Sequence, residues 1–430
     1  MTLTRRRFIT HGTAGLGALA LGHLPLPALA QGEIMPASGK RVVVVGGGWG
    51  GATAAKYLRM QDPGIEVVLV ETGEVFRSCP ISNWVIGGIR TMDDITVGYD
   101  GLVAHHGVKL MRDTVTGINT AAKTVSVESG GFLRYDRLVL SPGITLRRDA
   151  IAGLEAARER FPAAWKAGPE TQLLRDRLQA MAAGGTVALS VPPAPFRCPP
   201  GPYERVSLIA DYLKRDKPGS KLVVFDANQN IISKGALFQA AWDELYAGII
   251  DYRPDHAVTR VDGATGTLYT DFDEVTAEVA NVIPPQQANR LVHDAGLVPE
   301  GRQWAPVKPW DFTSTEADAV HVIGDATDGS VVGAVPKSGF VANSMGKVAA
   351  AAAVALLNGR EAPRPSLANT CYSLVSAEEG ISVTAIYDYD DATGKIVAVE
   401  GASGLSPART ALIKRNAEDW AQAIWRDMLA

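Results

Sequence analysis

The chain has little cysteine, and none of it has the spacing of a metal site or a haem site. Its 430 residues include three cysteines, Cys79, Cys198 and Cys371, which lie far apart in segments that read as loops. No Cys-x-x-Cys or Cys-x-x-Cys-His motif occurs, and the seven histidines show no ligand spacing. We therefore expect no zinc ribbon, no attached haem and no metal site in this chain.

The N-terminus carries an apolar run that is too short to cross a bilayer, which takes about 20 apolar residues. A twin-arginine pattern over residues 4–9 precedes this run, Ala14–Gly22, and the small-residue cleavage site Ala28-Leu29-Ala30 follows it. We predict that residues 1–30 are a twin-arginine signal peptide; a weak membrane anchor is the alternative. Such signals export proteins that have already folded, often with a cofactor, so we expect a periplasmic protein that holds one.

The chain has fewer basic than acidic residues. The 42 lysines and arginines face 46 acidic residues, which gives a net charge of −4. Residues 1–30 contain three arginines and no acids, so their removal changes the net charge from −4 to −7. This balance argues against nucleic acid or an anionic membrane surface as a partner. An oxidising compartment also permits disulfides, and three cysteines leave one unpaired after a single bridge.

A glycine fingerprint near the N-terminus predicts a dinucleotide site. The apolar strand expected over residues 40–45 is followed by Gly46, Gly48 and Gly51 in a G-x-G-x-x-G pattern, and then by a helix. A second apolar strand ends at Glu71. The glycines let the backbone approach a pyrophosphate at the helix N-terminus, and the acid can accept hydrogen bonds from the adenosine ribose.

A second fingerprint of this kind is missing. The strand predicted over Gly185–Val191 runs into the segment Pro192-Pro193-Ala194-Pro195-Phe196-Arg197-Cys198. Proline has no backbone N–H to donate, so this loop cannot form a phosphate-binding turn of that type. We infer that a nicotinamide site is absent.

Two later segments indicate which dinucleotide is bound. One is a strand that turns tightly at Gly143. The other ends in Gly324-Asp325 and is followed by a long helix from Lys337 to about Leu357. Together they resemble the FAD domain of the glutathione-reductase-like disulfide oxidoreductases. That resemblance implies that Asp325 holds the ribityl chain, and the helix N-terminus with Lys337 would favour the negative charge of a reduced flavin.

This organisation predicts an α/β fold with two Rossmann-like, three-layer nucleotide-binding domains (glutathione-reductase-like) and a small α+β C-terminal domain. The FAD-binding domain is expected over residues 31–150 and 281–358. The second Rossmann-like domain, without a nicotinamide fingerprint, is expected over residues 151–280. Residues 359–430 form the expected C-terminal interface domain, with a hairpin over Ile381–Glu400 and a final helix.

Four strings carry a more specific resemblance, and three of them contain the cysteines: SCPISNWVIGG (78–88), FRCPPGPYER (196–205), PKSGFVANSMGKVAAAA (336–352) and NTCYSLVS (369–376). They resemble the flavoprotein subunit of flavocytochrome c sulfide dehydrogenase, in the order found in that family. The resemblance implies a redox-active disulfide between Cys198 and Cys371 beside the flavin, and a thioether from Cys79 to the flavin 8α-methyl group. A purely structural disulfide and a buried, apolar Cys79 are the alternatives.

The same resemblance implies a function. Hydrosulfide attacks the disulfide and leaves a persulfide, two electrons pass to FAD, and the sulfur leaves as zero-valent sulfur or polysulfide. A c-type cytochrome subunit accepts the electrons. Glu204 is expected to shuttle a proton or tune the thiols, or else to form a solvated pair with Arg205. Trp425 is expected to line the sulfur site, or else to contribute only to the packing of the last helix.

Three other functions fit parts of the sequence. A sulfide:quinone reductase, which donates to quinone, shares the fold and the disulfide chemistry. It would need an apolar quinone-side surface, however, and the predicted helix Ala408–Leu429 is interrupted by charges. An NAD(P)H-dependent disulfide reductase is disfavoured by the missing second fingerprint. A FAD-stabilised binding protein with a structural disulfide is the non-enzymatic alternative.

Overall fold

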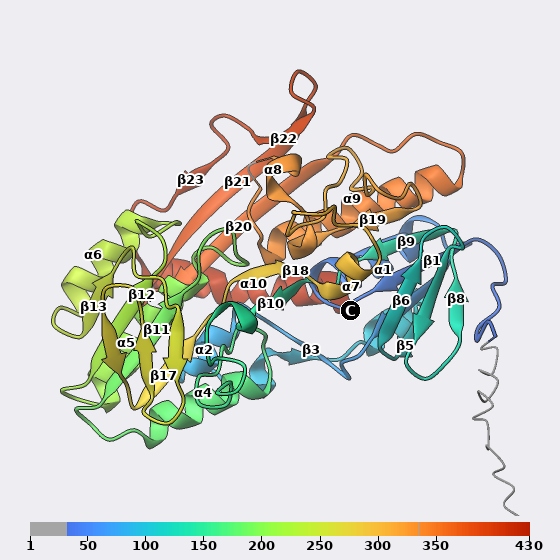
Figure 1. Cartoon of the computed structure of the whole chain (residues 1–430). Coiled ribbons are helices and arrows are strands. Elements are labelled where there is room, and N and C mark those ends of the chain that lie inside the picture. Colours follow the sequence, from blue (N-terminus) through green and yellow to red (C-terminus); the bar gives the residue numbers. More distant parts are fainter. Residues whose placement is uncertain (1–31, 334) are drawn as a thin grey trace, which may run out of the picture.

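The computed structural model of the chain describes residues 32–333 and 335–430 (Figure 1). The signal peptide predicted over residues 1–30 therefore lies outside the described residues. Within them, two parallel sheets lie at opposite ends of the molecule, and a third, antiparallel sheet crosses above them.

The first parallel sheet contains the glycine fingerprint. Its five strands run in the order β19-β9-β1-β2-β5. Their bounds are β1 (Arg41–Val45), β2 (Glu66–Glu71), β5 (Lys109–Arg112), β9 (Arg137–Leu140) and β19 (Val320–Val322). Strand β1 is buried along its whole length, as its run of valines predicts for a strand covered on both faces. Because the carboxyl ends of parallel strands share one edge, the segments after β1, β2, β9 and β19 meet there.

Two long helices cover one face of this sheet. Helix α1 (Trp49–Gln61) packs along α9 (Gly339–Leu357), and Gly346 allows the contact, since a Cβ there would lie 2.5 Å from the carbonyl oxygen of Gly50. By length and apolar composition alone, α9 could cross a membrane. In this fold it is a core helix, with 72% of its most apolar window buried. A three-stranded antiparallel sheet accompanies the parallel one: β6 (Val115–Asn119), β7 (Thr124–Val127) and β8 (Phe132–Arg134).

The second parallel sheet has four strands in the order β13-β12-β11-β17. They are β11 (Thr186–Val191), β12 (Lys221–Asp226), β13 (Ile250–Arg253) and β17 (Val279–Val282), so β17 crosses the domain boundary predicted at residue 280. The helices that accompany this sheet are α4 (Pro169–Ala180), α5 (Gly201–Asp216) and α6 (Gly235–Leu245), and β14 (Arg260–Asp262), β15 (Thr267–Tyr269) and β16 (Glu274–Thr276) form a small antiparallel sheet.

The C-terminal sheet joins the two ends of the molecule. The expected hairpin is formed by β21 (Gly380–Asp390) and β22 (Lys395–Ala398), while β23 (Gly404–Leu405) also pairs with β21. The sequence analysis missed β20 (Ser366–Leu374), which pairs with β21 and carries Cys371, so Cys371 lies in a strand and not in a loop. Strand β20 packs against α5, α9 and the last helix, α10 (Ala411–Leu429) (Figure 1).

Short elements complete the described chain: β3 (Phe76–Arg77), α2 (Ser82–Ile86), η1 (Asp93–Ile95), β4 (Thr96–Val97), α3 (Asp100–His106), β10 (Ile144–Leu146), η2 (Arg148–Ala150), β18 (Gln286–Ala288), α7 (Arg290–Asp294), η3 (Gly324–Ala326) and α8 (Gly329–Val332).

Candidate functional site

The fingerprint glycines lie where the chain leaves β1, and two of them are required by close backbone contacts. Gly46 has a φ of 92°, and a Cβ there would lie 2.5 Å from the carbonyl oxygen of Ser141. A Cβ on Gly51 would lie 1.8 Å from the carbonyl oxygen of Gly46. These two glycines therefore let the turn fold against its own neighbours, as the fingerprint requires.

Gly48 serves a different purpose, because a Cβ there would meet no atom of the protein within 4 Å. It is the N-cap of α1, so this open space adjoins a helix N-terminus, where backbone N–H groups favour phosphate. The Glu71 carboxylate accepts hydrogen bonds from Gly47 N at 2.5 Å and from Gly73 N at 2.7 Å, which holds it beside the same turn. This arrangement fits the pyrophosphate and ribose of a dinucleotide.

Gly143 and Asp325 lie at the same edge of the sheet. Gly143 has a φ of 71°, and its carbonyl oxygen accepts from Asn289 N at 3.0 Å. Asp325 follows β19, and its Oδ1 atom is buried without a hydrogen-bond partner among the described residues. Burial raises the pKa of the Asp325 carboxyl, against the opposing charges of Arg197 and Lys337. A buried, unpaired acceptor needs a donor, and a ribityl hydroxyl of FAD fits that need.

Lys337 was expected to favour the negative charge of a reduced flavin, but its ammonium group bonds to the protein backbone. It precedes α9, and its Nζ donates to the carbonyl oxygens of Asp325 at 2.9 Å and Thr327 at 2.5 Å. The ammonium also lies 3.7 Å from the centre of the Trp304 ring. Burial lowers the pKa of Lys337 to about 8. The side chain thus braces the loop after β19, because its donors are directed at backbone carbonyls.

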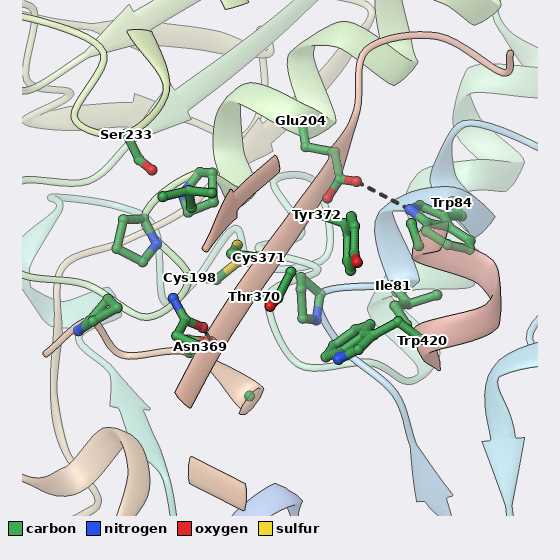
Figure 2. Close-up of a pocket in the computed structure, with 18 residues that line it drawn as sticks. Ile81, Trp84, Cys198, Glu204, Ser233, Asn369, Thr370, Cys371, Tyr372 and Trp420 are labelled. Carbon is green, nitrogen blue, oxygen red and sulfur yellow. Dashed lines mark hydrogen bonds between the residues drawn. The ribbon is translucent and has the colours of Figure 1, made fainter. Parts of the chain in front are cut away.

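Cys198 and Cys371 line one mostly apolar pocket (Figure 2). The pocket wall also includes Ile81, Trp84, Pro336, Ser338, Gly339, Tyr372 and Trp420, so it borders the N-terminus of α9. Within the described residues no disulfide is formed, and both cysteines are free thiols. Burial raises the pKa of the Cys198 thiol, and the nearby Cys371 raises it further.

The loop that carries Cys198 is tightly constrained. Cys198 has a φ of 55°, in the left-handed region, and its backbone N–H donates to the carbonyl oxygen of Lys337 at 2.7 Å. Its own carbonyl oxygen accepts from Gly201 N at 2.8 Å, at the start of α5. These bonds join the loop to the segment that leads into α9, so the thiol is held beside the helix N-terminus that points into the pocket.

Glu204 is buried beside the two thiols. It is 2% exposed and accepts hydrogen bonds from Asn83 Nδ2 at 3.0 Å and Leu374 N at 2.8 Å. A third comes from Trp84 Nε1 at 3.1 Å (Figure 2). Burial raises the pKa of the Glu204 carboxyl against these donors. The carboxylate in turn raises the pKa of both thiols. Its place fits the expected tuning of the thiols.

The alternative of a solvated Glu204–Arg205 pair is wrong. Arg205 is 1% exposed and donates to Asn83 Oδ1 at 2.9 Å, to Asn281 Oδ1 at 2.9 Å and to the carbonyl oxygens of Ala163 at 3.0 Å and Ala164 at 2.7 Å. The two charged side chains are neighbours in the sequence, but on the helix they project in directions about 100° apart. Each is therefore satisfied by different partners.

Lys234 is a site residue that the sequence analysis missed. It is 5% exposed, and its Nζ donates to the carbonyl oxygen of Cys371 at 2.9 Å and to Ser373 Oγ at 2.8 Å, and lies 3.9 Å from the Sγ atom of Cys371. One signal was available. A lysine immediately before an apolar helix opposes the helix dipole, so a tertiary partner should be sought for it.

Cys79 lines a second, smaller cavity that shares Pro80 and Cys198 with the first. That cavity is lined by Cys79, Trp165, Arg197 and Arg205 and also reaches Cys198. The Cys79 thiol lies 3.8 Å from the carbonyl oxygen of Trp165, to which it donates, and Arg197 lines the same cavity. The Cys79 side chain is partly exposed, which disfavours its alternative as a fully buried apolar residue.

Trp420, and not Trp425, lies in the wall of the pocket. Its ring stacks on Trp49 at 5.8 Å, and Trp49 Nε1 donates to the carbonyl oxygen of Cys79 at 2.9 Å. Trp425 is 5% exposed and belongs to the hydrophobic core. The two residues are five apart on α10, which places them about 140° apart around the helix. The last helix therefore presents Trp420 to the pocket and packs with Trp425.

The strand β12 ends at an acid, the position where an NAD-binding unit accepts the ribose. Here the Asp226 carboxylate accepts from Tyr203 Oη at 2.8 Å, Tyr252 Oη at 2.8 Å and Asn228 Nδ2 at 2.7 Å. Asn228 also donates to the carbonyl oxygen of Pro192 at 3.0 Å, in the proline segment. The acid is thus engaged by the protein's own side chains.

Comparison with known proteins identifies the family. Residues 40–177 match the pyridine nucleotide-disulphide oxidoreductases, residues 171–284 the central part of the sulfide dehydrogenase [flavocytochrome c] flavoprotein chain, and residues 363–429 the flavin-binding part of flavocytochrome c sulphide dehydrogenase. The flavoprotein chain of that enzyme from Chlorobaculum thiosulfatiphilum is 65% identical over 46 residues, which are 96% of that sequence and 11% of this chain. The chain belongs to the flavocytochrome c sulfide dehydrogenase flavoprotein family.

Other relatives of this flavocytochrome family member are more distant. The sulfide-quinone reductase of Aquifex aeolicus (strain VF5) is 31% identical over 91 residues, which are 21% of each chain. The solved sulfide:quinone oxidoreductase from that bacterium superposes with a TM-score of 0.74 at 18% identity, covering 91% of this chain and 92% of that one. Putidaredoxin reductase, in its covalent complex with putidaredoxin, gives 0.66 at 17% identity, covering 90% and 93%.

These superpositions confirm the predicted fold class, an α/β disulfide oxidoreductase fold. Membership of the family makes the chain a flavoprotein with FAD as its cofactor and a sulfide-oxidising oxidoreductase.

Proposed function

We propose that this protein is the sulfide dehydrogenase chain that oxidises hydrosulfide at a disulfide between Cys198 and Cys371 and passes the electrons through FAD to a c-type cytochrome subunit. The observation that carries the proposal is that these two cysteines, from distant segments, line one pocket beside the N-terminus of α9. A structural disulfide would have no reason to border a helix N-terminus, Glu204 and Lys234 together.

The chemistry begins at the disulfide. Hydrosulfide attacks one sulfur, the S–S bond breaks, and the products are a cysteine persulfide and a cysteine thiolate. The outer sulfur leaves as zero-valent sulfur or polysulfide, and the two cysteines return to the disulfide. FAD supplies the two-electron acceptor when bound. Ile81, Trp84 and Trp420 give the pocket an apolar wall, and Glu204 takes up and returns the proton that accompanies these steps.

The residues that would hold FAD come from several strands of the first sheet. The ADP part would be held by Gly46, Gly48, Gly51 and Glu71. The ribityl chain of the flavin would lie beside Gly143 and Asp325. We also propose that Cys79 forms the thioether to the flavin. The cavity that Cys79 lines also reaches Cys198, which supports this, because a flavin bonded to Cys79 there would lie beside the cysteine pair.

The partner and the compartment are part of the same proposal. Residues 359–430 would form the interface domain for the cytochrome, and residues 31–150, 281–358 and 151–280 the two nucleotide-binding domains. The twin-arginine pattern over residues 4–9 supports export to the periplasm, where c-type cytochromes accept electrons. The engagement of Asp226 by tyrosines supports an electron donor other than a nicotinamide.

A quinone acceptor is the second candidate, and the similarity to sulfide:quinone oxidoreductase favours it. Charged residues of α10 argue against a lipid-facing role for that helix. Glu418 pairs with Arg90 and with Lys414, and Asp427 pairs with Lys347 at 2.9 Å. An amphipathic membrane helix keeps its charges on a polar face toward water, whereas the pairs with Arg90 and Lys347 tie α10 to the rest of the protein.

The test is an anaerobic titration of the purified holoprotein with sulfide, followed by the visible absorbance of the flavin. We expect sulfide to bleach the flavin, oxidised cytochrome c to restore it, and NADH in a parallel cuvette to have no effect. Cys198→Ser and Cys371→Ser should each abolish bleaching by sulfide while dithionite still reduces the flavin. Bleaching that survives both substitutions would overturn the disulfide chemistry. Recovery with a short-chain quinone but not with cytochrome c would overturn the cytochrome as acceptor.

A further inference from the structure

Lys234 directs its ammonium group at strand β20. Its contacts with Cys371 O, Ser373 Oγ and Cys371 Sγ, at 2.9, 2.8 and 3.9 Å, match the three N–H donors of an ammonium group. The side chain is 5% exposed, so water screens its charge little. A cation therefore lies against one of the two redox sulfurs.

Local preferences do not account for a lysine at this position. Lys234 is the N-cap of α6 and has a φ of 57°, in the left-handed region that most residues avoid. A positive charge at a helix N-terminus also opposes the helix dipole. The contacts with β20 offset both costs, which indicates that the position of the charge is itself useful.

The segment after Cys198 lacks the donors that the start of a helix normally supplies. Pro199, Pro200 and Pro202 have no backbone N–H. The N–H of Gly201 is bonded to the carbonyl oxygen of Cys198 at 2.8 Å. Such amides stabilise a thiolate at a helix N-terminus. Here none of the four residues 199–202 offers a free N–H group to the Cys198 sulfur.

The titratable groups around the cysteine pair affect the pKa values of the two thiols differently. The groups that face the Cys371 sulfur are Cys198 and Glu204 from α5 and the loop before it, Lys234 from the loop before α6, and Tyr387 from β21. Burial raises the pKa of the Cys371 thiol, and Lys234 is the largest opposing influence. Burial, Cys371 and then Glu204 raise the pKa of the Cys198 thiol well above its ordinary value, against Arg197 and Lys234.

We infer that Lys234 makes Cys371 the leaving group when the disulfide opens, so that hydrosulfide attacks Cys198 and the substrate sulfur is carried there. The inference rests on the proposed disulfide chemistry. A bond forms between the hydrosulfide sulfur and Cys198 Sγ, the Cys198–Cys371 bond breaks, and its electron pair goes to Cys371 Sγ beside the ammonium. The proton stays on the outer sulfur. Disulfides open fastest toward the sulfur that is the better leaving group.

The first experiment uses the wild-type holoprotein. It is treated with substoichiometric sulfide without oxygen and quenched with iodoacetamide, and the tryptic peptides are analysed by mass spectrometry. We expect the extra sulfur on the Cys198 peptide and simple alkylation on the Cys371 peptide. Extra sulfur on Cys371 would overturn the inference and leave the disulfide chemistry intact. Extra sulfur on neither peptide would overturn the proposed disulfide chemistry and the inference with it.

The second experiment measures the pH dependence of alkylation of both thiols in the fully reduced protein. Cys371 should react at a lower pH than Cys198. Lys234→Met should move the Cys371 midpoint upward by about 1–3 pH units, the range expected for loss of an opposite charge at this distance, and Lys234→Arg should restore it. Lys214→Met, which removes an exposed lysine bonded to Leu245 O, is the control and should change neither midpoint. Cys198 reacting at the lower pH in the wild-type protein would overturn the inference without any variant.

Discussion

The carboxylate of Glu204 accepts a hydrogen bond from the backbone N–H of Leu374 at 2.8 Å, and both residues are buried. This bond joins α5, which follows Cys198, to β20, which carries Cys371. The separation of the two thiols is thus tied to a carboxylate that also raises the pKa of each. Geometry and electrostatics of the cysteine pair depend on the same side chain.

Glu204→Gln should change both properties. The new amide nitrogen would face Asn83 Nδ2, and Asn83 cannot turn over without losing its bond to Arg205. We expect a loss of about 1–3 kcal/mol in the free energy of unfolding. The lost negative charge should lower the pH at which both thiols alkylate, the opposite of the Lys234→Met effect. Chemical denaturation and thiol alkylation measure the two effects, with the exposed Glu378→Gln as control. Thiol midpoints that rise would contradict this prediction.

Cys79→Ser should separate flavin binding from flavin attachment. Serine keeps the size of the side chain but cannot form a thioether, so the flavin should remain with the native protein and leave it on acid precipitation. The wild-type protein should keep its flavin fluorescence on a denaturing gel. The measurement is that fluorescence, together with the intact mass. Flavin that stays with the denatured Cys79→Ser chain would show that another residue carries the bond.

Gly48→Ala and Gly51→Ala should fail in different ways. An alanine Cβ at position 51 would lie 1.8 Å from a carbonyl oxygen, so the turn must move, and we expect a loss of about 1–3 kcal/mol of stability with or without FAD. A Cβ at position 48 meets no protein atom within 4 Å, so Gly48→Ala should fold normally and bind less FAD. Thermal unfolding and the ratio of flavin to protein absorbance distinguish the two. Equal flavin content in Gly48→Ala and wild type would place the pyrophosphate elsewhere.

His321 should make the fold sensitive to mild acid. Its Nδ1 bonds to Asp311 O at 2.9 Å, and Nε2 receives the Arg137 Nε–H at 3.2 Å. Burial, and then the Arg137 charge, lower the pKa of His321 to about 4, from an ordinary 6.5. The unfolded chain therefore takes up the proton first as the pH falls from 6.5 toward 4, and up to roughly 3 kcal/mol of stability is lost over that window.

His321→Gln should flatten this pH dependence. A glutamine does not titrate, so the melting temperature should fall less between pH 7 and pH 5 than in the wild-type protein. His105→Gln, at an exposed position, should leave the wild-type slope unchanged. Carboxylates that titrate in the same range affect all three proteins alike. Identical slopes in His321→Gln and wild type would show that His321 is not held neutral.

Local patterns were sufficient for the nucleotide site. The strand, the three glycines and Glu71 lie within one short segment, and their roles follow from backbone contacts that any such segment must make. The helix predicted from Lys337 to about Leu357 and the hairpin predicted over Ile381–Glu400 also formed close to these bounds. Strand β20 was missed because it packs between helices and its partner β21, and its polar residues match neither an alternating nor a fully apolar pattern.

The pocket itself required long-range contacts. The choice between Trp420 and Trp425 depends on the rotation of α10 about its axis, which neighbouring elements determine. The burial of Arg205 depends on acceptors such as Asn281, far along the chain. These contacts have no counterpart in the spacing of the sequence.

Three properties follow from the order of the amino acids alone: the chain binds a dinucleotide, its cysteines have no metal-site spacing, and a proline segment follows the strand where a second fingerprint would stand. These are short-range properties of backbone conformation and donor availability. The positions of Glu204 and Lys234 at the cysteine pair, in contrast, depend on long-range packing. Charges from separate elements meet there because β20 brings Cys371 against α5 and the start of α6, and a buried charge acts only on the groups that the fold places beside it.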